Sequence, residues 1–244
     1  MSKQRVLVFK SADELAQAAA EKFVECAREA LAQHGFFRVA AAGGNTPKRV
    51  YSLLSSDLFK ERIEWSKVHI FFGDERCVPP NHPESNYRMV YETLTSQVPI
   101  PAENVHRIKG EVDPEHSASL YAAELKAFFS GASWPQFDLV MLGMGEDGHT
   151  ASLFPWTAAL KERTAWVAAN WVEQLGVFRI TLTESAINAA ANVIVLVAGA
   201  SKAERLAEVL NGPLEPERLP VQLIKPRQGP LVWMIDAAAA VRLE

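Results

Sequence analysis

The chain has 244 residues, of which 48% are hydrophobic and 22% charged, a composition typical of a globular protein and not of a disordered or collagen-like one. Its net charge of −4 and pI of about 5.9 argue against a nucleic-acid-binding protein, which presents a basic excess. The longest apolar runs fall far short of the about 20 residues that a membrane helix requires, and the first residues contain too short an apolar run for a signal peptide.

The two cysteines, Cys26 and Cys77, lie far apart and match no metal-binding spacing. We therefore expect free thiols in a reducing cytoplasm and no metal site. No internal repeat, low-complexity tract or long linker divides the sequence, so residues 1–244 are expected to form a single domain. We expect no nucleic-acid or membrane partner, and a monomer or small homo-oligomer.

Short apolar runs alternate with longer amphipathic segments along the chain. The apolar runs predict strands at 6–9, 36–42, 68–72, 137–142, 179–183, 193–198 and 231–236. The amphipathic segments predict helices at 11–34, 47–54, 87–98, 114–129 and 202–210. Ser11 with Glu14, and Ser201 with Glu204, match the S-x-x-E capping box at a helix start. The Pro- and Gly-rich segments 79–83 and 213–230 are expected to be surface loops.

Nearly continuous apolar strands separated by helices indicate a doubly wound α/β fold, with a mostly parallel sheet covered by helices on both faces. Ligands of such sheets bind beyond the carboxyl ends of the strands. The segments directly after the strands, 43–47, 73–77, 143–155 and 199–202, are therefore the candidate site.

The first of these segments, AAGGNTP at 41–47, joins a strand to a helix through two glycines. Glycines allow a close backbone approach, and the helix start, with Thr46 as the expected N-cap, offers free amides to an anion such as phosphate. No G-x-x-x-x-G-K-[ST] sequence is present, so this is not a nucleotide P-loop. A tight turn with an ordinary threonine cap explains the same residues.

The segment 143–148, GMGEDG, matches the G-x-G-x-x-G fingerprint of dinucleotide-binding proteins. Its two carboxylates would repel a pyrophosphate, and Pro155 excludes a long helix directly after the turn. We therefore expect no dinucleotide here.

His149 follows this turn, two residues after Asp147. An imidazole exchanges protons near neutral pH, and a neighbouring carboxylate orients it and stabilises its charged form. A serine nucleophile is not expected, because G-x-S-x-G is absent. A structural histidine bound to a backbone carbonyl is the alternative.

Charged residues follow other strands. Asp74 and Arg76 lie in GDER, Arg179 begins RITLT, and Lys202 lies in the first turn of a predicted helix. A cation is disfavoured at a helix N-terminus, and a bound anion would account for Lys202. Surface ion pairs and solvated side chains are the alternative explanation.

Together, GGNTP, FFGDERCVPPNHPESNYR, LGMGEDGHTASLFP and RITLT resemble the 6-phosphogluconolactonases in sequence and order. The resemblance implies a fold shared with glucosamine-6-phosphate deaminases. It also implies hydrolysis of 6-phospho-D-glucono-1,5-lactone to 6-phosphogluconate in the oxidative pentose phosphate pathway, without a metal or organic cofactor.

On matching positions, the resemblance makes His149 the general base that activates water and Asp147 the residue that orients it. Asp74 and Arg76 would line the lactone. The residues implied to hold the 6-phosphate are Gly44, Asn45, Thr46, Arg179 and Lys202. Many relatives have serine before the paired glycines, where this chain has Ala42.

Two other functions are weighed against lactone hydrolysis. In the deaminases the corresponding loop reads roughly DGHIAFNEP, with an acidic residue before the proline, where this chain has Phe154. A deaminase needs that additional acid, so Phe154 favours the lactonase. A non-catalytic sugar-phosphate sensor would need a DNA-reading helix pair, for which the chain has no spare N-terminal length or basic face.

Overall fold

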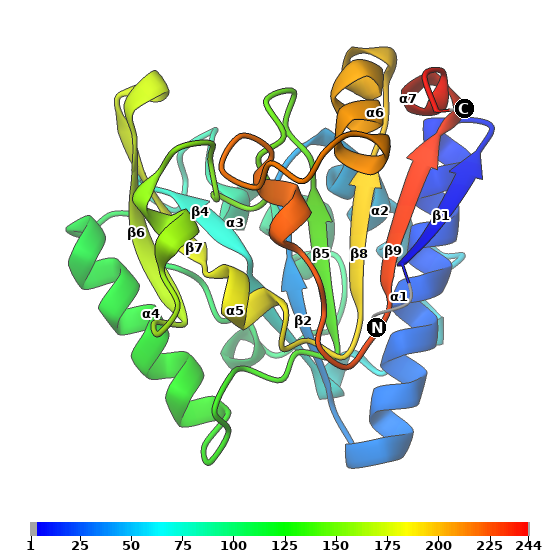
Figure 1. Cartoon of the computed structure of the whole chain (residues 1–244). Helices are drawn as coiled ribbons and strands as arrows, with labels where there is room; N and C mark the ends of the chain where they lie inside the picture. The colour runs from blue at the N-terminus through cyan, green and yellow to red at the C-terminus, as the bar shows by residue number, and fades with distance from the viewer. Residues whose placement is uncertain (1–3, 244) are drawn as a thin grey trace.

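Six parallel strands form the central sheet of the computed structural model, which describes residues 4–243 (Figure 1). Its strands are β1 (Gln4–Phe9), β2 (Phe37–Ala41), β3 (Val68–Phe72), β5 (Leu139–Gly143), β8 (Val193–Val197) and β9 (Leu231–Asp236). They are ordered β1-β9-β8-β5-β2-β3, and every neighbouring pair is parallel. The predicted mostly parallel sheet is confirmed.

A second, three-stranded antiparallel sheet lies beside the first and was not predicted. It contains β4 (Asp74–Arg76), β6 (Val167–Val172) and β7 (Val177–Leu182), in the order β4-β7-β6. Residues 74–76, expected in a loop, are thus a strand, and the strand expected at 179–183 begins at Val177. Three residues are too few to show an alternating pattern in the sequence. Strand β4 is recognised only by its pairing with β7.

The helices are α1 (Ala12–His34), α2 (Asn45–Leu54), α3 (Asn86–Val90), α4 (Pro114–Phe128), α5 (Glu184–Ile187), α6 (Ala203–Asn211) and α7 (Ala237–Ala240). In Figure 1, α2 lies behind the strands of the large sheet and α5 lies in front of them, so both faces are covered. Helix α4 packs against β6 and β7. The helix expected at 87–98 is shorter, since α3 continues only as a π-helical turn, Tyr91–Thr95.

The two predicted capping boxes have different outcomes. The Ser11 hydroxyl accepts from Glu14 N at 3.2 Å, which confirms Ser11 as the cap of α1, whereas the Glu14 carboxylate accepts from Lys10 N at 3.0 Å and not from the Ser11 N–H that a capping box uses. The second is wrong. Ser201 lies inside a 3₁₀ turn (Ala200–Lys202), and α6 begins after Lys202 without a side-chain cap.

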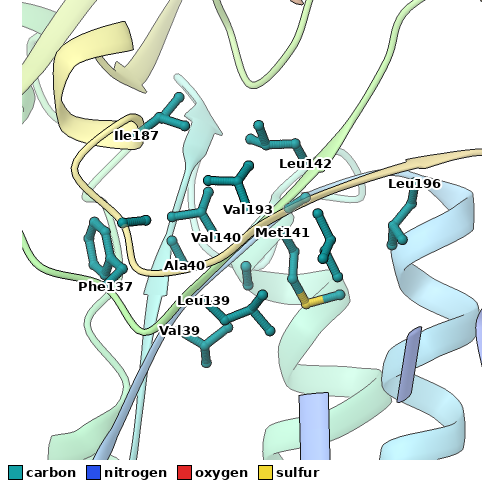
Figure 2. Packing of buried hydrophobic residues seen from close by; sticks show 14 of the residues in the cluster. Val39, Ala40, Phe137, Leu139, Val140, Met141, Leu142, Ile187, Val193 and Leu196 are labelled. Carbon is teal, nitrogen blue, oxygen red and sulfur yellow. The ribbon is translucent and has the colours of Figure 1, made fainter. Parts of the chain in front are cut away.

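The central strands are apolar on both faces, as expected for a sheet covered on both sides. Figure 2 shows Val140 and Leu142 of β5 on the same side as Ile187 of α5, with Leu139 and Met141 on the other. The same hydrophobic cluster includes residues of β6 and β7, so the small sheet packs on the core of the large one.

The segment expected as a surface loop at 213–230 is partly buried. Leu219 and Val221 are fully buried, and Pro220–Leu223 forms a 3₁₀ turn. Val221 N donates to Gly148 O at 3.0 Å, so the turn supports the loop after β5. Its apolar residues lie among prolines and charges and show no strand or helix period.

Two buried tyrosines hold the chain where β2 and β3 end. The Tyr51 hydroxyl accepts from Ala42 N and donates to Ala42 O, both at 2.9 Å. The Tyr121 hydroxyl accepts from Phe72 N at 2.8 Å and donates to Phe72 O at 3.1 Å. Tyr51 therefore holds the backbone of Ala42, whose own side chain offers no hydroxyl.

None of the helices within residues 4–243 combines the length and the apolarity needed to span a lipid bilayer.

We expect Tyr121→Phe to lower the free energy of unfolding by about 1–3 kcal/mol, because Phe72 N–H and C=O would be left buried without a partner. Chemical denaturation measures this change. Tyr91→Phe is the control, since Tyr91 is 50% exposed, and it should leave stability within about 0.5 kcal/mol. Equal stability of the Tyr121 variant and the wild type would contradict the role of this hydroxyl.

Candidate active site

A cavity of about 770 Å³ lies at the carboxyl ends of β2, β5 and β8 and extends to β4 and β7. All nine residues singled out from the sequence line it: Gly44, Asn45, Thr46, Asp74, Arg76, Asp147, His149, Arg179 and Lys202. They come from loops and strands spread over more than half of the chain. The cavity also has polar residues that the sequence did not single out, Asn86 and Ser152 among them.

His149 and Asp147 form a close pair at the cavity wall. Asp147 Oδ1 lies 2.6 Å from His149 Nδ1 and also accepts from the His149 backbone N–H at 3.1 Å. Burial tends to raise the pKa of Asp147, but the hydrogen bonds and charge of His149 outweigh it and hold the pKa below its usual range. The carboxylate therefore stays ionised and suits the tautomer with the proton on Nδ1, in which Nε2 can accept a hydrogen bond.

The imidazole is packed closely by its neighbours. The Phe154 ring stacks on it with centroids 4.1 Å apart and planes inclined by 22°. Gly145 also lies against the pair, because a Cβ there would lie 2.1 Å from His149 Nδ1 and 2.5 Å from Asp147 Oδ1. Gly148 has φ of +84°, a conformation that favours glycine. No long helix follows this turn directly: the next helical residues are those of a short 3₁₀ segment, Ala158–Lys161. A dinucleotide-binding turn would lead into a long helix, so the sequence-based expectation of no long helix is confirmed.

The start of α2 faces the cavity with its amides uncapped. Its N-cap is Gly44, at φ of +97°, without a side-chain hydrogen bond, and its first turn holds no acidic residue. The prediction that Thr46 caps this helix is wrong, because helical geometry begins at Asn45 and places Thr46 inside the first turn. Free amides and the positive end of the helix dipole favour an anion here.

Arg76 and Arg179 lie opposite each other on the paired strands β4 and β7. Among residues 4–243 neither arginine has a carboxylate within ion-pair distance. Their hydrogen bonds go to backbone oxygens, of Glu84 for Arg76 and of Phe178 for Arg179. Burial and the charge of Arg76 lower the pKa of Arg179. Two like charges directly opposite in a sheet repel each other, and an anion between them would relieve this repulsion.

Lys202 lies on the other side of the cavity, at the start of α6. Its Nζ is 3.8 Å from Glu146 Oε1, whose side chain is 65% exposed. A pair at this distance with one partner exposed stabilises by only about 0–1 kcal/mol, so Lys202 remains available to a bound anion.

Asp74 is buried at the edge of the cavity and held by two side chains. Ser152 Oγ donates to its Oδ2 at 2.6 Å, and Asn86 Nδ2 lies 3.4 Å from Oδ1. Asn86 also fills the space where a Cβ at Gly43 would be, at 2.0 Å. The first glycine of the pair, Gly43, therefore permits this contact between the two loops.

The neighbouring carboxylate, Glu75, holds the segment that carries Asn86. It is 2% exposed and accepts from the backbone N–H groups of Arg76, Asn86 and Tyr87 and from Ser85 Oγ. Burial raises the pKa of Glu75, and these four hydrogen bonds oppose the rise. The sequence showed Glu75 and Asn86 only as members of the motif GDERCVPPNHPESNYR, because their pairing requires the fold.

Within the described residues, no group of three or more histidine, cysteine or acidic side chains is arranged to hold a metal ion.

Comparison with known proteins identifies relatives of the whole chain. Residues 10–233 match the family model described as glucosamine-6-phosphate isomerases/6-phosphogluconolactonase. The chain is 42% identical over 217 residues to a 6-phosphogluconolactonase of Nostoc sp., covering 88% of each protein. The solved structure of 6-phosphogluconolactonase from Trypanosoma brucei is similar with a TM-score of 0.86 and 30% identity, over 100% of both chains.

A solved monomeric glucosamine-6-phosphate deaminase is also similar, with a TM-score of 0.82 over 98% of this chain and 99% of that one. Its identity is only 20%, so this likeness concerns the fold alone. The expectation of a fold shared with the deaminases is confirmed.

We expect Gly145→Ala to break the Asp147–His149 hydrogen bond, because the added methyl group would overlap both side chains. The Nδ1 proton signal of His149 in proton NMR should disappear, and stability should fall by about 1–3 kcal/mol from overpacking. Gly143→Ala is the matched control at the end of β5, since a Cβ there meets no atom of the described residues within 4 Å. An unchanged signal in the Gly145 variant would show that the loop accommodates the methyl group.

Proposed function

The chain belongs to the family of glucosamine-6-phosphate isomerases and 6-phosphogluconolactonases, and we propose that His149 is the general base with which it hydrolyses its substrate. It is a lactonase of the pentose phosphate pathway, which converts 6-phospho-D-glucono-1,5-lactone to 6-phosphogluconate. The observation that carries the proposal is the 2.6 Å pair of His149 and Asp147 in the cavity wall.

Phe154 supports hydrolysis over deamination. Its ring stacks on His149 at the position where the deaminase motif has an acidic residue, so an apolar face replaces a third proton-carrying group. An isomerising deaminase must open a ring and move several protons. A lactone carbonyl is already activated and needs one base and support for an oxyanion, which the pair of His149 and Asp147 and the nearby arginines supply.

The 6-phosphate is assigned to the start of α2 with Arg179 and Lys202. The uncapped amides of Gly44, Asn45 and Thr46 suit a phosphate oxygen, and Arg179 has no carboxylate partner within the described chain. A guanidinium can bind phosphate through two parallel hydrogen bonds. Lys202 adds a compact charge from the opposite wall. Binding the far end of the substrate in this way would place C1 beside the imidazole.

In the proposed mechanism, His149 Nε2 removes a proton from water while the water oxygen attacks C1 of the lactone. The carbonyl oxygen becomes an oxyanion, which Arg76 stabilises. Collapse of the tetrahedral intermediate breaks the bond between C1 and the ring oxygen, and the imidazolium returns its proton to that oxygen. Asp147 stabilises the imidazolium between these steps. Asp74, held by Ser152 and Asn86, accepts a hydrogen bond from a substrate hydroxyl.

The remaining sequence-based expectations belong to the same proposal. A single domain over residues 1–244 is supported by one hydrophobic cluster that includes both sheets. A cytoplasmic location is supported by the two free cysteines, Cys26 and Cys77. A monomer or small homo-oligomer stays a prediction.

We expect His149→Ala to lower kcat by about 10²–10⁴-fold, the usual contribution of a general base, with KM within a few-fold. The measurement is hydrolysis of freshly made lactone coupled to oxidation of 6-phosphogluconate, with the spontaneous rate subtracted. His116→Ala is the control, since His116 lies on α4 outside the cavity. Near wild-type kcat in His149→Ala would rule out this residue as the base.

Arg179→Ala and Lys202→Ala should mainly raise KM, each by about 10–100-fold, because each removes a charged hydrogen bond to the phosphate. Lys161→Ala, whose side chain is 76% exposed and outside the cavity, is the control for loss of a surface charge. The same coupled assay gives KM and kcat. An unchanged KM in both cavity variants would show that the phosphate lies elsewhere.

A further inference from the structure

Ser152, in the loop that carries His149, is bound by one residue from each strand of the small sheet. Its Oγ donates to Asp74 Oδ2 of β4 at 2.6 Å, and its backbone N–H donates to Thr181 Oγ1 of β7 at 3.2 Å. Its carbonyl oxygen accepts from Asn170 Nδ2 of β6 at 2.9 Å. Every polar group of Ser152 is thus used, each by a different strand.

We propose that Ser152 is a positioning residue, which sets the place of His149 relative to the two arginines of the small sheet. This inference rests on the proposed function, in which His149 is the base. We name Ser152 with its three partners, Asp74, Asn170 and Thr181, the serine clamp.

The serine clamp is buried and its hydrogen bonding is complete. All four residues are between 0% and 7% exposed. The Thr181 hydroxyl donates to Leu182 O at 3.0 Å, so it meets Ser152 as an acceptor. Asn170 Nδ2 also donates to Thr157 Oγ1 at 3.0 Å. Because buried polar groups without partners are costly, displacing Ser152 would leave acceptors and donors of all three strands unpaired.

The strand register connects the serine clamp to the arginines. Asp74 pairs with Thr181, and two residues along, Arg76 pairs with Arg179, which in turn pairs with Asn170. Side chains two residues apart on a strand lie on the same face. The serine clamp and both guanidinium groups therefore share the face of the small sheet that borders the cavity.

The short connection between Ser152 and His149 is also constrained. Leu153 N donates to Thr150 O at 2.9 Å, and Thr150 Oγ1 donates to Gly143 O at 2.8 Å at the end of β5. Ala151 adopts φ of +46° between them, a conformation unusual for a residue with a side chain. With so few free torsions, movement of Ser152 is transmitted to the imidazole.

Loss of the Ser152 hydroxyl should therefore affect catalysis more than binding, since of the substrate-binding residues only Asp74 loses a partner and it keeps its contact with Asn86. The phosphate residues assigned to α2 and Lys202 do not contact the serine clamp, and Arg179 keeps its place in β7. We expect Ser152→Ala to lower kcat by about 10–100-fold, the scale of an ångström-sized misplacement, with KM within about three-fold.

Ser117→Ala is the matched control. Ser117 is 1% exposed on α4, and its hydroxyl has no hydrogen-bond partner among residues 4–243, so the same atoms are removed without breaking a hydrogen bond there. It should keep wild-type kcat. Thr181→Val, an isosteric change, removes the acceptor for Ser152 N–H and should lower kcat in the same direction. If Ser152→Ala melts well below the wild type, Thr181→Val is the variant in which kcat is measured instead.

A double-mutant cycle separates positioning of the base from a general structural role. If Ser152 acts through His149, then Ser152→Ala should not lower the residual rate of His149→Ala any further. An equal loss in both backgrounds, or a loss confined to KM, would overturn the inference. The inference would also be overturned if Ser152→Ala and Thr181→Val both keep wild-type kcat while His149→Ala is inactive. Wild-type kcat in His149→Ala would instead overturn the proposed function, and the inference with it.

Discussion

The hydrogen bond between Asp147 and His149 is the interaction around which the site is built, and it needs support from distant parts of the chain. The missing Cβ at Gly145 leaves room for it, the Phe154 ring lies against the imidazole, and Gly148 turns the loop with a positive φ. Val221 supports that turn through a backbone hydrogen bond. A flexible imidazole would sample many orientations, whereas this packing leaves one, with Nε2 as the free acceptor.

Two arginines of the cavity have no carboxylate within ion-pair distance among residues 4–243, although Asp74, Glu146 and Asp147 also line the cavity. Arg76 and Arg179 face each other across two strands, and the first turn of α2 has neither a capping side chain nor an acidic residue. Each feature weakens the free protein, because like charges repel and helix amides remain without side-chain partners. An anion bound there, such as the substrate phosphate that we propose, would offset both costs.

An aromatic ring lies against the histidine of this chain. In this chain an aromatic ring stacks on the imidazole, and the serine two residues earlier is turned away to the small sheet. The loop thus has one proton-carrying pair, sufficient for attack by water on an activated carbonyl. Fold similarity to a deaminase at 20% identity does not distinguish the two reactions, and the proposed distinction depends on Phe154.

The sequence alone determined the parallel sheet, the limits of the long helices and the loops that carry the site, because apolar periods and glycines act locally. It also placed Asp147 beside His149, since a two-residue separation in a tight turn leaves little freedom. It could not show β4, nor the contacts of Asn86, Glu75 and Ser152, which form between segments as many as 78 residues apart. Only the tertiary structure decided these, because strand pairing and buried polar partners depend on which surfaces the whole chain brings together.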